Sequence, residues 1–205
     1  MLRLSASLMA LFALIAVAGC GDDAPSPAAG DSSNKATGGD NGTGGGATAQ
    51  AKLAPASVGQ APNVHQCGHV YFAAQPSADD LRDFKEAGVK TVINLRMPGE
   101  NKAFDEQQVV EQELGLQYSN PGFDSAQTLD DGVFFRVRDL LKRKEPVLVH
   151  CASANRVGAV WLAYRVLDDG VGYEQALAEA KQIGLKSEPL EERARRYIEA
   201  KQADE

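Results

Sequence analysis

The sequence lacks the features that mark several common classes of protein. Its 205 residues include 21 basic and 28 acidic side chains, which give a formal net charge of −7, and the basic residues form no stripe. This balance argues against a general nucleic-acid binder, which needs clustered Lys and Arg. No internal repeat is apparent, and the length suits one compact domain with extra segments. The apolar run near the N-terminus is too short for a comfortable membrane span.

Cysteine is also rare: the chain has three, and the first lies in a distinctive N-terminal segment. Residues 1–23 (MLRLSASLMALFALIAVAGCGDD) have the layout of an export signal, with Arg3, an apolar core and a small-residue cleavage region. The letters VAGC resemble the lipobox of bacterial lipoproteins, which implies that Cys20 becomes the lipidated first residue of the mature chain. The resemblance predicts a chain tethered to the cell envelope on the periplasmic side. Gly21 after the cysteine favours the outer membrane, and an ordinary cleaved secretory signal is the alternative.

Composition divides the chain into three parts. Residues 1–20 form the predicted signal peptide. Residues 21–60 are dominated by Gly, Ala, Ser, Asp and Asn, so they cannot bury enough apolar surface to offset their ordering entropy. We therefore expect a disordered linker there. Residues 61–205 are sufficient for one domain with a hydrophobic core.

Strands and helices alternate along this domain. Strands are predicted at 69–74 (HVYFAA), 91–95 (TVINL), 114–120 (LGLQYSN) and 146–150 (PVLVH). Helices are predicted after Ser77, a natural N-cap, from Phe104 to Leu114, around 129–144, and at 156–170, 173–184 and 190–201. This order predicts an α/β fold with a central, mainly parallel sheet of four to five strands flanked by helices.

The loop after the strand at 146–150 has the chemistry of an anion site. A strand that opens through a tight loop into a helix directs backbone N–H groups and a helix dipole towards one point. Cys151 begins this loop, where the same field favours the reactive thiolate. Arg156 lies at the helix start, where its planar fork can bind two oxygens of a tetrahedral anion. A nucleophile and an oxyanion clamp in one concave site suit covalent transfer of a phosphoryl group.

These residues resemble the active site of cysteine-based tyrosine and dual-specificity phosphatases. VLVHC, a short loop and Arg156 carry the likeness, and YFAAQPSADDLRDFKEAGVKTVINLR (71–96) is similar to the N-terminal half of the bacterial beta-lactamase hydrolase-like phosphatase family. The resemblance covers about residues 64–200. It implies a dual-specificity-phosphatase-like fold, a phosphorylated protein or small molecule as substrate, and no cofactor or metal.

The resemblance also implies roles for individual residues. Cys151 attacks phosphorus, and Arg156 holds the phosphate together with the loop amides of Ala152, Ser153, Ala154 and Asn155. His150 orients the loop and favours the thiolate. The general acid of related enzymes is an aspartate between the preceding strand and helix, which makes Asp124 the candidate. Two other aspartates of that segment are expected to cap the following helix, Asp130 and Asp131.

Three departures from the larger phosphatase group leave alternatives open. Four residues separate Cys151 from Arg156 where most of that group have five. The bacterial family shares this short spacing, but a six-residue loop also resembles rhodanese sulfurtransferases. Ala154 replaces a usual glycine, which puts a positive φ in doubt there. Val157 replaces the usual Ser or Thr, so hydrolysis of a phosphocysteine is expected to be slow. A phosphate- or sulfate-binding module with little turnover is the non-catalytic alternative.

Other polar residues have weaker claims to a site. Arg96 is expected to pair with Glu100 and not to enter the site. A metal site at His65, Cys67 and His69 is disfavoured, because the three lack a fourth ligand. A disulfide between Cys67 and Cys151 stays open, since sequence separation gives no distance.

Overall fold

A computed structural model describes residues 50–100 and 102–204. The predicted signal peptide, Cys20 and most of the predicted linker lie outside the described residues. Within them, we find no helix whose length and apolar character would let it cross a bilayer.

The domain is built on a six-stranded sheet in the order β1-β2-β3-β6-β4-β5. The strands are β1 (Ala54–Pro55), β2 (His65–Cys67), β3 (Val70–Ala73), β4 (Thr91–Asn94), β5 (Gln117–Ser119) and β6 (Val147–His150). Strands β3, β6, β4 and β5 run parallel, whereas β1 and β2 pair antiparallel at one edge. The predicted α/β class and mainly parallel sheet are confirmed. The four strands read from the sequence are the parallel ones, and the two it missed have two and three residues.

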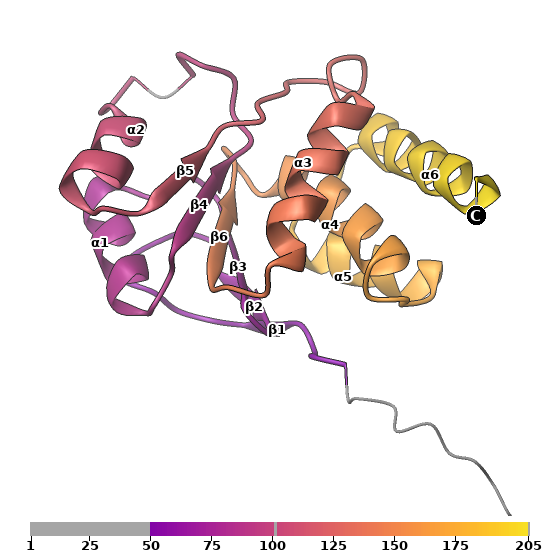
Figure 1. Cartoon of the computed structure of the whole chain (residues 1–205), viewed down its shortest axis with the longest axis horizontal. Coiled ribbons are helices and arrows are strands. Elements are labelled where there is room, and N and C mark those ends of the chain that lie inside the picture. The colour runs from indigo at the N-terminus through magenta and orange to yellow at the C-terminus, as the bar shows by residue number, and fades with distance from the viewer. Residues whose placement is uncertain (1–49, 101, 205) are drawn as a thin grey trace, which may run out of the picture. The chain divides into compact units, whose positions relative to one another are not determined.

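Helices cover both faces of this sheet (Figure 1). They are α1 (Ala78–Glu86), α2 (Glu106–Gln108), the π-helix η1 (Val109–Glu113), α3 (Asp131–Lys142), α4 (Asn155–Leu167), α5 (Tyr173–Ile183) and α6 (Glu188–Ala203). One face carries α1, α2 and η1, and the other carries α3 to α6. The central strand β6 shows why its sequence is continuously apolar. Val147 and Val149 pack into the core beneath α3–α6, while Leu148 packs into the core beneath α1 and η1.

Local sequence explains where several helices begin. The Ser77 hydroxyl accepts from the Asp80 N–H, and the Asp80 carboxylate accepts from the Ser77 N–H, which forms the capping box of α1. Asp130 caps α3 by accepting from the Val133 N–H at 2.9 Å. Its neighbour Asp131 lies in the first turn and pairs with Arg193. Asp130 therefore has the capping role expected of it, whereas Asp131 does not cap the helix and only adds negative charge to its first turn.

The boundary expected at residue 60 is too late. Residues 50–60 already belong to the folded unit, because β1 pairs with β2 and the Ala51 carbonyl accepts from buried Arg165 at 3.1 Å. The composition of this segment does not distinguish it from the linker, because it contacts the domain through backbone groups and small side chains. The helix expected from Phe104 also begins later, at Glu106, and continues as η1.

Candidate active site

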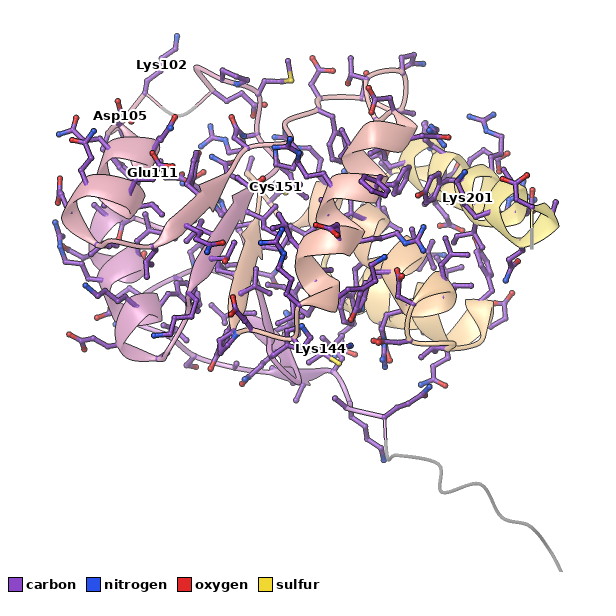
Figure 2. The ribbon with its side chains drawn as sticks, viewed as in Figure 1. Lys102, Asp105, Glu111, Lys144, Cys151 and Lys201 are labelled. Carbon is purple, nitrogen blue, oxygen red and sulfur yellow. The ribbon has the colours of Figure 1, made fainter. Side chains whose placement is uncertain are left out.

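The site is organised around the end of the central strand. In register, His150 of β6 lies beside Ala73 of β3 and Asn94 of β4, so three parallel strands end at the same edge. Ligands of open α/β sheets bind at this carboxyl edge. Cys151 follows directly, with 1% of its surface exposed, and Figure 2 shows it inside the domain, at the other end of β6 from Lys144. A loop of three residues then leads to α4, which begins at Asn155.

The loop turns through a left-handed residue. Ala154 has φ 64° and ψ 1°, so the doubt raised by the missing glycine is not supported. The conformation costs an L-residue about 1 kcal/mol. Ala154 is fully buried in the core, and its carbonyl accepts from the Gly158 N–H at 3.1 Å. Asn155 fixes the loop from outside, because its Oδ1 accepts the N–H groups of Lys186 and Ser187. Such a turn directs successive N–H groups into one concavity.

Arg156 extends from the first turn of α4 across the edge of the sheet. Nη1 donates to Glu100 Oε1 at 2.7 Å and to the carbonyls of Phe123 and Leu95 at 2.6 and 3.2 Å. Nη2 donates to Glu100 Oε2 at 2.7 Å, which completes a two-point pair. The side chain is 12% exposed. Arg156 is therefore held rigidly, and it does not behave as a surface residue.

One edge of the guanidinium remains available to a ligand. Among the described residues, no oxygen accepts from the Nε–H of Arg156, whereas the Nη1 side is fully used by Glu100 and the two carbonyls. The pKa of Arg156 is raised, chiefly by its hydrogen bond with Glu100, and the Cys151 side chain contributes as well. A guanidinium with one edge anchored presents the other edge, Nε and Nη2, in a fixed direction. That edge can bind two oxygens of a tetrahedral anion.

Glu100 is the anchor of this guanidinium. The hydrogen bond from Arg156 lowers the pKa of Glu100 from its ordinary 4.5 to about 2. Arg96 also donates to Glu100, Nε to Oε2, at 3.4 Å. The expected Arg96–Glu100 pair is therefore present, but Glu100 lies closer to Arg156 than to Arg96. Arg96 is linked to the site through Glu100. Pairing with Glu100 and belonging to the site are therefore compatible for Arg96.

Asp124 lies on the same cleft as Arg156. The cleft has a volume of about 580 Å³, and its lining includes Glu100, Asp124, Ser153, Asn155, Arg156 and Leu190. Asp124 is exposed, and its Oδ1 accepts from the Thr128 hydroxyl at 2.8 Å. Hydrogen bonds from Thr128 and Ser125 lower the pKa of Asp124. The structure thus brings Asp124 and Arg156 to one cleft, with the carboxylate form of Asp124 favoured while no ligand is bound.

His150 supports the loop from the other face of the sheet. Successive side chains of a strand alternate, so His150 shares the side of Leu148, whereas Cys151 packs with the cluster of Val147 and Val149. His150 is fully buried, and its Nε2 hydrogen bonds to Glu106 Oε1 at 2.8 Å. Glu106 is itself buried. The contacts of His150 therefore tie the strand end to α2.

Comparison with known proteins identifies the architecture. No family model and no curated protein sequence matches the chain. Solved structures do match. A DUF442 protein from Shewanella putrefaciens CN-32 is 21% identical, with a TM-score of 0.58 over 69% of this chain and 94% of its own. TpbA of P. aeruginosa is 24% identical, with a TM-score of 0.55 over 75% and 91%. Kinase-associated phosphatase is 15% identical, with a TM-score of 0.54 over 65% and 86%. The chain has a phosphatase-like fold.

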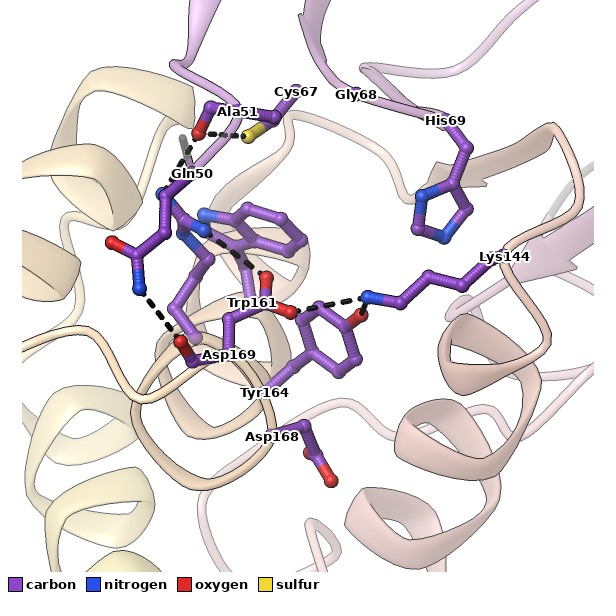
Figure 3. Close-up of a pocket in the computed structure, with 11 residues that line it drawn as sticks. Gln50, Ala51, Cys67, Gly68, His69, Lys144, Trp161, Tyr164, Asp168 and Asp169 are labelled. Atoms are coloured by element: carbon purple, nitrogen blue, oxygen red, sulfur yellow. Dashed lines mark hydrogen bonds and ion pairs between the residues drawn. The ribbon is translucent and has the colours of Figure 1, made fainter. Parts of the chain in front are cut away.

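Cys67 lies far from the loop of this phosphatase-like fold. It ends β2 beside Val70, whose partner Val147 begins β6, whereas Cys151 follows the end of β6. Four residues of strand span roughly 13 Å, beyond the reach of a disulfide. Both cysteines are free. Burial raises the pKa of Cys67 to about 11, and its Sγ donates to the Ala51 carbonyl (Figure 3).

The three candidate metal ligands near Cys67 do not share one strand. His65 and Cys67 lie on β2, but His69 follows the turn at Gly68, and its Nε2 hydrogen bonds to the Leu141 carbonyl. The turn interrupts the strand alternation, although His69 and Cys67 still line one pocket (Figure 3). A sequence pattern with period two holds only while the strand continues.

Sequence reasoning missed three residues that surround the loop: Gln75, Glu100 as the partner of Arg156, and Glu106. Gln75 and Glu100 each follow a predicted strand, so a search of strand ends could have found them. Glu106 lies in α2, and no motif marks it. Only the packing of α2 against the end of β6 brings it to His150.

Proposed function

We propose that the protein is a cysteine-dependent phosphatase that hydrolyses phosphate monoesters. One observation carries this proposal: Cys151 and a rigidly held Arg156 flank a tight loop at the carboxyl edge of the sheet. The loop turns at left-handed Ala154 and runs into the N-terminus of α4. Such loops bind anions through their N–H groups and the helix dipole.

The structural neighbours support this choice among anion-binding functions. Kinase-associated phosphatase has a catalytic-site cysteine, which is replaced by serine in the structure compared with this chain. A variant of TpbA was solved in complex with pTyr, at 23% identity and a TM-score of 0.55. A phosphorylated substrate, either a protein or a small molecule, fits the same loop here.

In the proposed reaction, each residue of the site has one role. The Cys151 thiolate attacks phosphorus, an S–P bond forms, and the bond from phosphorus to the leaving oxygen breaks. Arg156 and the loop amides bind the equatorial oxygens as their charge develops. Asp124, which lies on the same cleft, donates a proton to the leaving oxygen. Water then gives a proton to the Asp124 carboxylate and attacks the phosphocysteine, and the S–P bond breaks, which releases phosphate and restores the thiolate.

The first test compares the full chain with Cys151→Ser against an aryl phosphate. We expect turnover to be lost while phosphate still binds, because the loop amides and Arg156 are unchanged. Thiosulfate with cyanide is the parallel assay for a sulfurtransferase. Turnover in that assay, or an aryl phosphatase activity that survives Cys151→Ser, would contradict the proposal. Phosphate binding without turnover in the wild type would instead support a binding module.

We also propose that the domain is tethered to the cell envelope by a lipid on Cys20, at the periplasmic face of the outer membrane. The support is the VAGC sequence after a short apolar run. Cys20→Ala should leave the chain unprocessed or release it from the membrane fraction. Unchanged membrane recovery and unchanged mass would contradict lipidation.

A further inference from the structure

A continuous chain of side-chain hydrogen bonds joins the two ends of the anion loop. We call it the loop network, and its members in order are His150, Glu106, Gln75, Arg96, Glu100 and Arg156. His150 precedes Cys151, and Arg156 ends the loop. The network therefore connects the residue before the nucleophile to the anion clamp by a path outside the backbone.

Gln75 is the centre of the loop network. Its Nε2 donates to Glu106 Oε2 at 2.9 Å, and its Oε1 accepts from Arg96 Nη1 at 2.6 Å. Its backbone N–H donates to the carbonyl of Ala152, inside the loop, at 3.4 Å. One residue thus contacts the branch to His150, the branch to Arg156 and the loop itself.

The charges of the network explain why this position needs an amide. Glu106 on one side needs a donor, and Arg96 on the other side needs an acceptor. A glutamine head group supplies both. Glutamate would face Glu106 with a second carboxylate, and an apolar side chain would remove the contact with Glu106 and the contact with Arg96. Only one orientation of the amide satisfies both contacts.

The side chains of the loop network are largely buried, so a polar group that loses its partner there costs free energy. His150 is fully buried and Glu106 is 4% exposed. The side chains of Arg96 and Arg156 are each 12% exposed. Losing a partner at such sites forces the remaining group to move towards water or another partner. A disturbance at Gln75 would therefore reach His150 through Glu106, and Arg156 through Arg96 and Glu100.

We propose that Gln75 is a positioning residue that sets the placement of Arg156 relative to Cys151. The proposal rests on the proposed function, because it assigns Gln75 to the same anion site. It predicts that Gln75 affects binding and turnover of phosphate esters without touching the substrate.

The test uses Gln75→Glu, which keeps the shape and removes one donor, and Gln75→Met, which removes both polar contacts without adding charge. Gln108→Glu is the matched control, because Gln108 is exposed on the same helix as Glu106 and the change adds the same charge. We expect kcat/KM for an aryl phosphate to fall by roughly tenfold to a hundredfold in both Gln75 variants, through a lower kcat and a higher KM. The control should stay within about twofold of the wild type.

A double-variant cycle separates positioning from a general loss of stability. If Gln75 acts through Arg156, then Gln75→Met should lower kcat/KM much less in an Arg156→Lys background than in the wild type. Multiplicative losses, or Gln75 variants that match the control, would overturn the proposal. Gln75→Met must also remain folded at the assay temperature by circular dichroism. If it does not, Gln75→Glu replaces Gln75→Met in the same cycle with Arg156→Lys, and the same comparison of kcat/KM applies.

Phosphate protection of Cys151 against iodoacetamide supplies a readout that needs no turnover. If the wild type is protected but inactive, the proposed phosphatase function fails, while Gln75 is still tested. Both Gln75 variants should then need at least about tenfold more phosphate for half-protection than Gln108→Glu. Equal protection in all three, or none in the wild type, would overturn the role of Gln75.

Discussion

Replacing Arg156 with Lys probes the anion site most specifically, because the charge is kept and only the planar fork is lost. Lysine presents its donors from a single nitrogen and cannot hold Glu100 on one edge and an anion on the other. If Arg156 served only a ligand and not packing, the substitution should change stability by under about 1 kcal/mol. The structure shows that the same side chain also donates to the carbonyls of Leu95 and Phe123.

The structure sets the size of both effects. Four donor contacts hold the guanidinium, and an ammonium group can replace about two of them. Hydrogen bonds to charged groups contribute roughly 1.5–3 kcal/mol each. Glu100 is 29% exposed, so solvent screening reduces each of the two lost contacts to about 1 kcal/mol, and we expect a loss of about 2 kcal/mol. Losing the second contact to the transition state should lower kcat/KM by about a hundredfold, roughly 2.7 kcal/mol.

The assay pairs steady-state kinetics on an aryl phosphate with thermal unfolding. In a folded unit of about 155 residues, a loss of 2 kcal/mol should lower Tm by roughly 4–8 °C. Arg143→Lys is the matched control, because Arg143 is half exposed and, within residues 50–100 and 102–204, forms its ion pair with Asp139. We expect that control to change kcat/KM by less than twofold and Tm by about 1 °C or less.

The kinetic and the thermal results for Arg156→Lys test two different roles of the arginine. Wild-type kcat/KM in Arg156→Lys would mean that the arginine does not hold the transferred phosphoryl group. A wild-type Tm would mean that the pair with Glu100 contributes little in solution. Vanadate or phosphate should protect Cys151 from alkylation much less in the variant, and equal protection would remove Arg156 from the anion site.

The other predictions concern single residues of the same site. Asp124→Ala should lower kcat by about a hundredfold, whereas Asp130→Ala should cost about 1 kcal/mol of stability and leave kcat unchanged; the reverse result would exchange their roles. The lowered pKa of Glu100 means that its ionised form stabilises the fold fully above pH 4.5, and this contribution is lost as the pH falls towards 2. Urea unfolding should therefore show the difference between the wild type and Glu100→Gln shrinking over that interval, and a constant difference would contradict it. Val157 is fully buried and has no hydroxyl, so the wild type should release a burst of about one equivalent of aryl alcohol before slow turnover. Val157→Thr should raise the steady rate several-fold, and a linear time course in the wild type would argue against slow dephosphorylation.

The parallel core of the fold could be predicted because its signals are local. Continuous apolar runs such as 146–150 mark strands that are buried on both faces. Ser77 and Asp130 mark helix starts through hydrogen bonds within three residues. The strands β1 and β2 could not be predicted in the same way. Each is short, and its pairing partner decides whether it forms.

The residues of the candidate site likewise divide into those predictable from local sequence and those that depend on tertiary structure. Cys151 and Arg156 are separated by four residues, so a strand, a loop and a helix start bring them together. Glu100 and Glu106 come from a different part of the chain, and only the parallel pairing of β4 with β6 delivers them to the loop. Ala154 adopts a positive φ because the loop closes around it, which outweighs the preference for glycine. Tertiary context decided these features.

The central claim is that Cys151 carries the phosphoryl group during turnover. Mixing the full chain with an excess of aryl phosphate, quenching in acid within the burst phase and mapping peptides by mass spectrometry tests it directly. We expect one added phosphoryl group on the peptide that contains Cys151 and none on that peptide in Cys151→Ser. Steady turnover with no phosphoryl group on Cys151, or with the group on another residue, would contradict it.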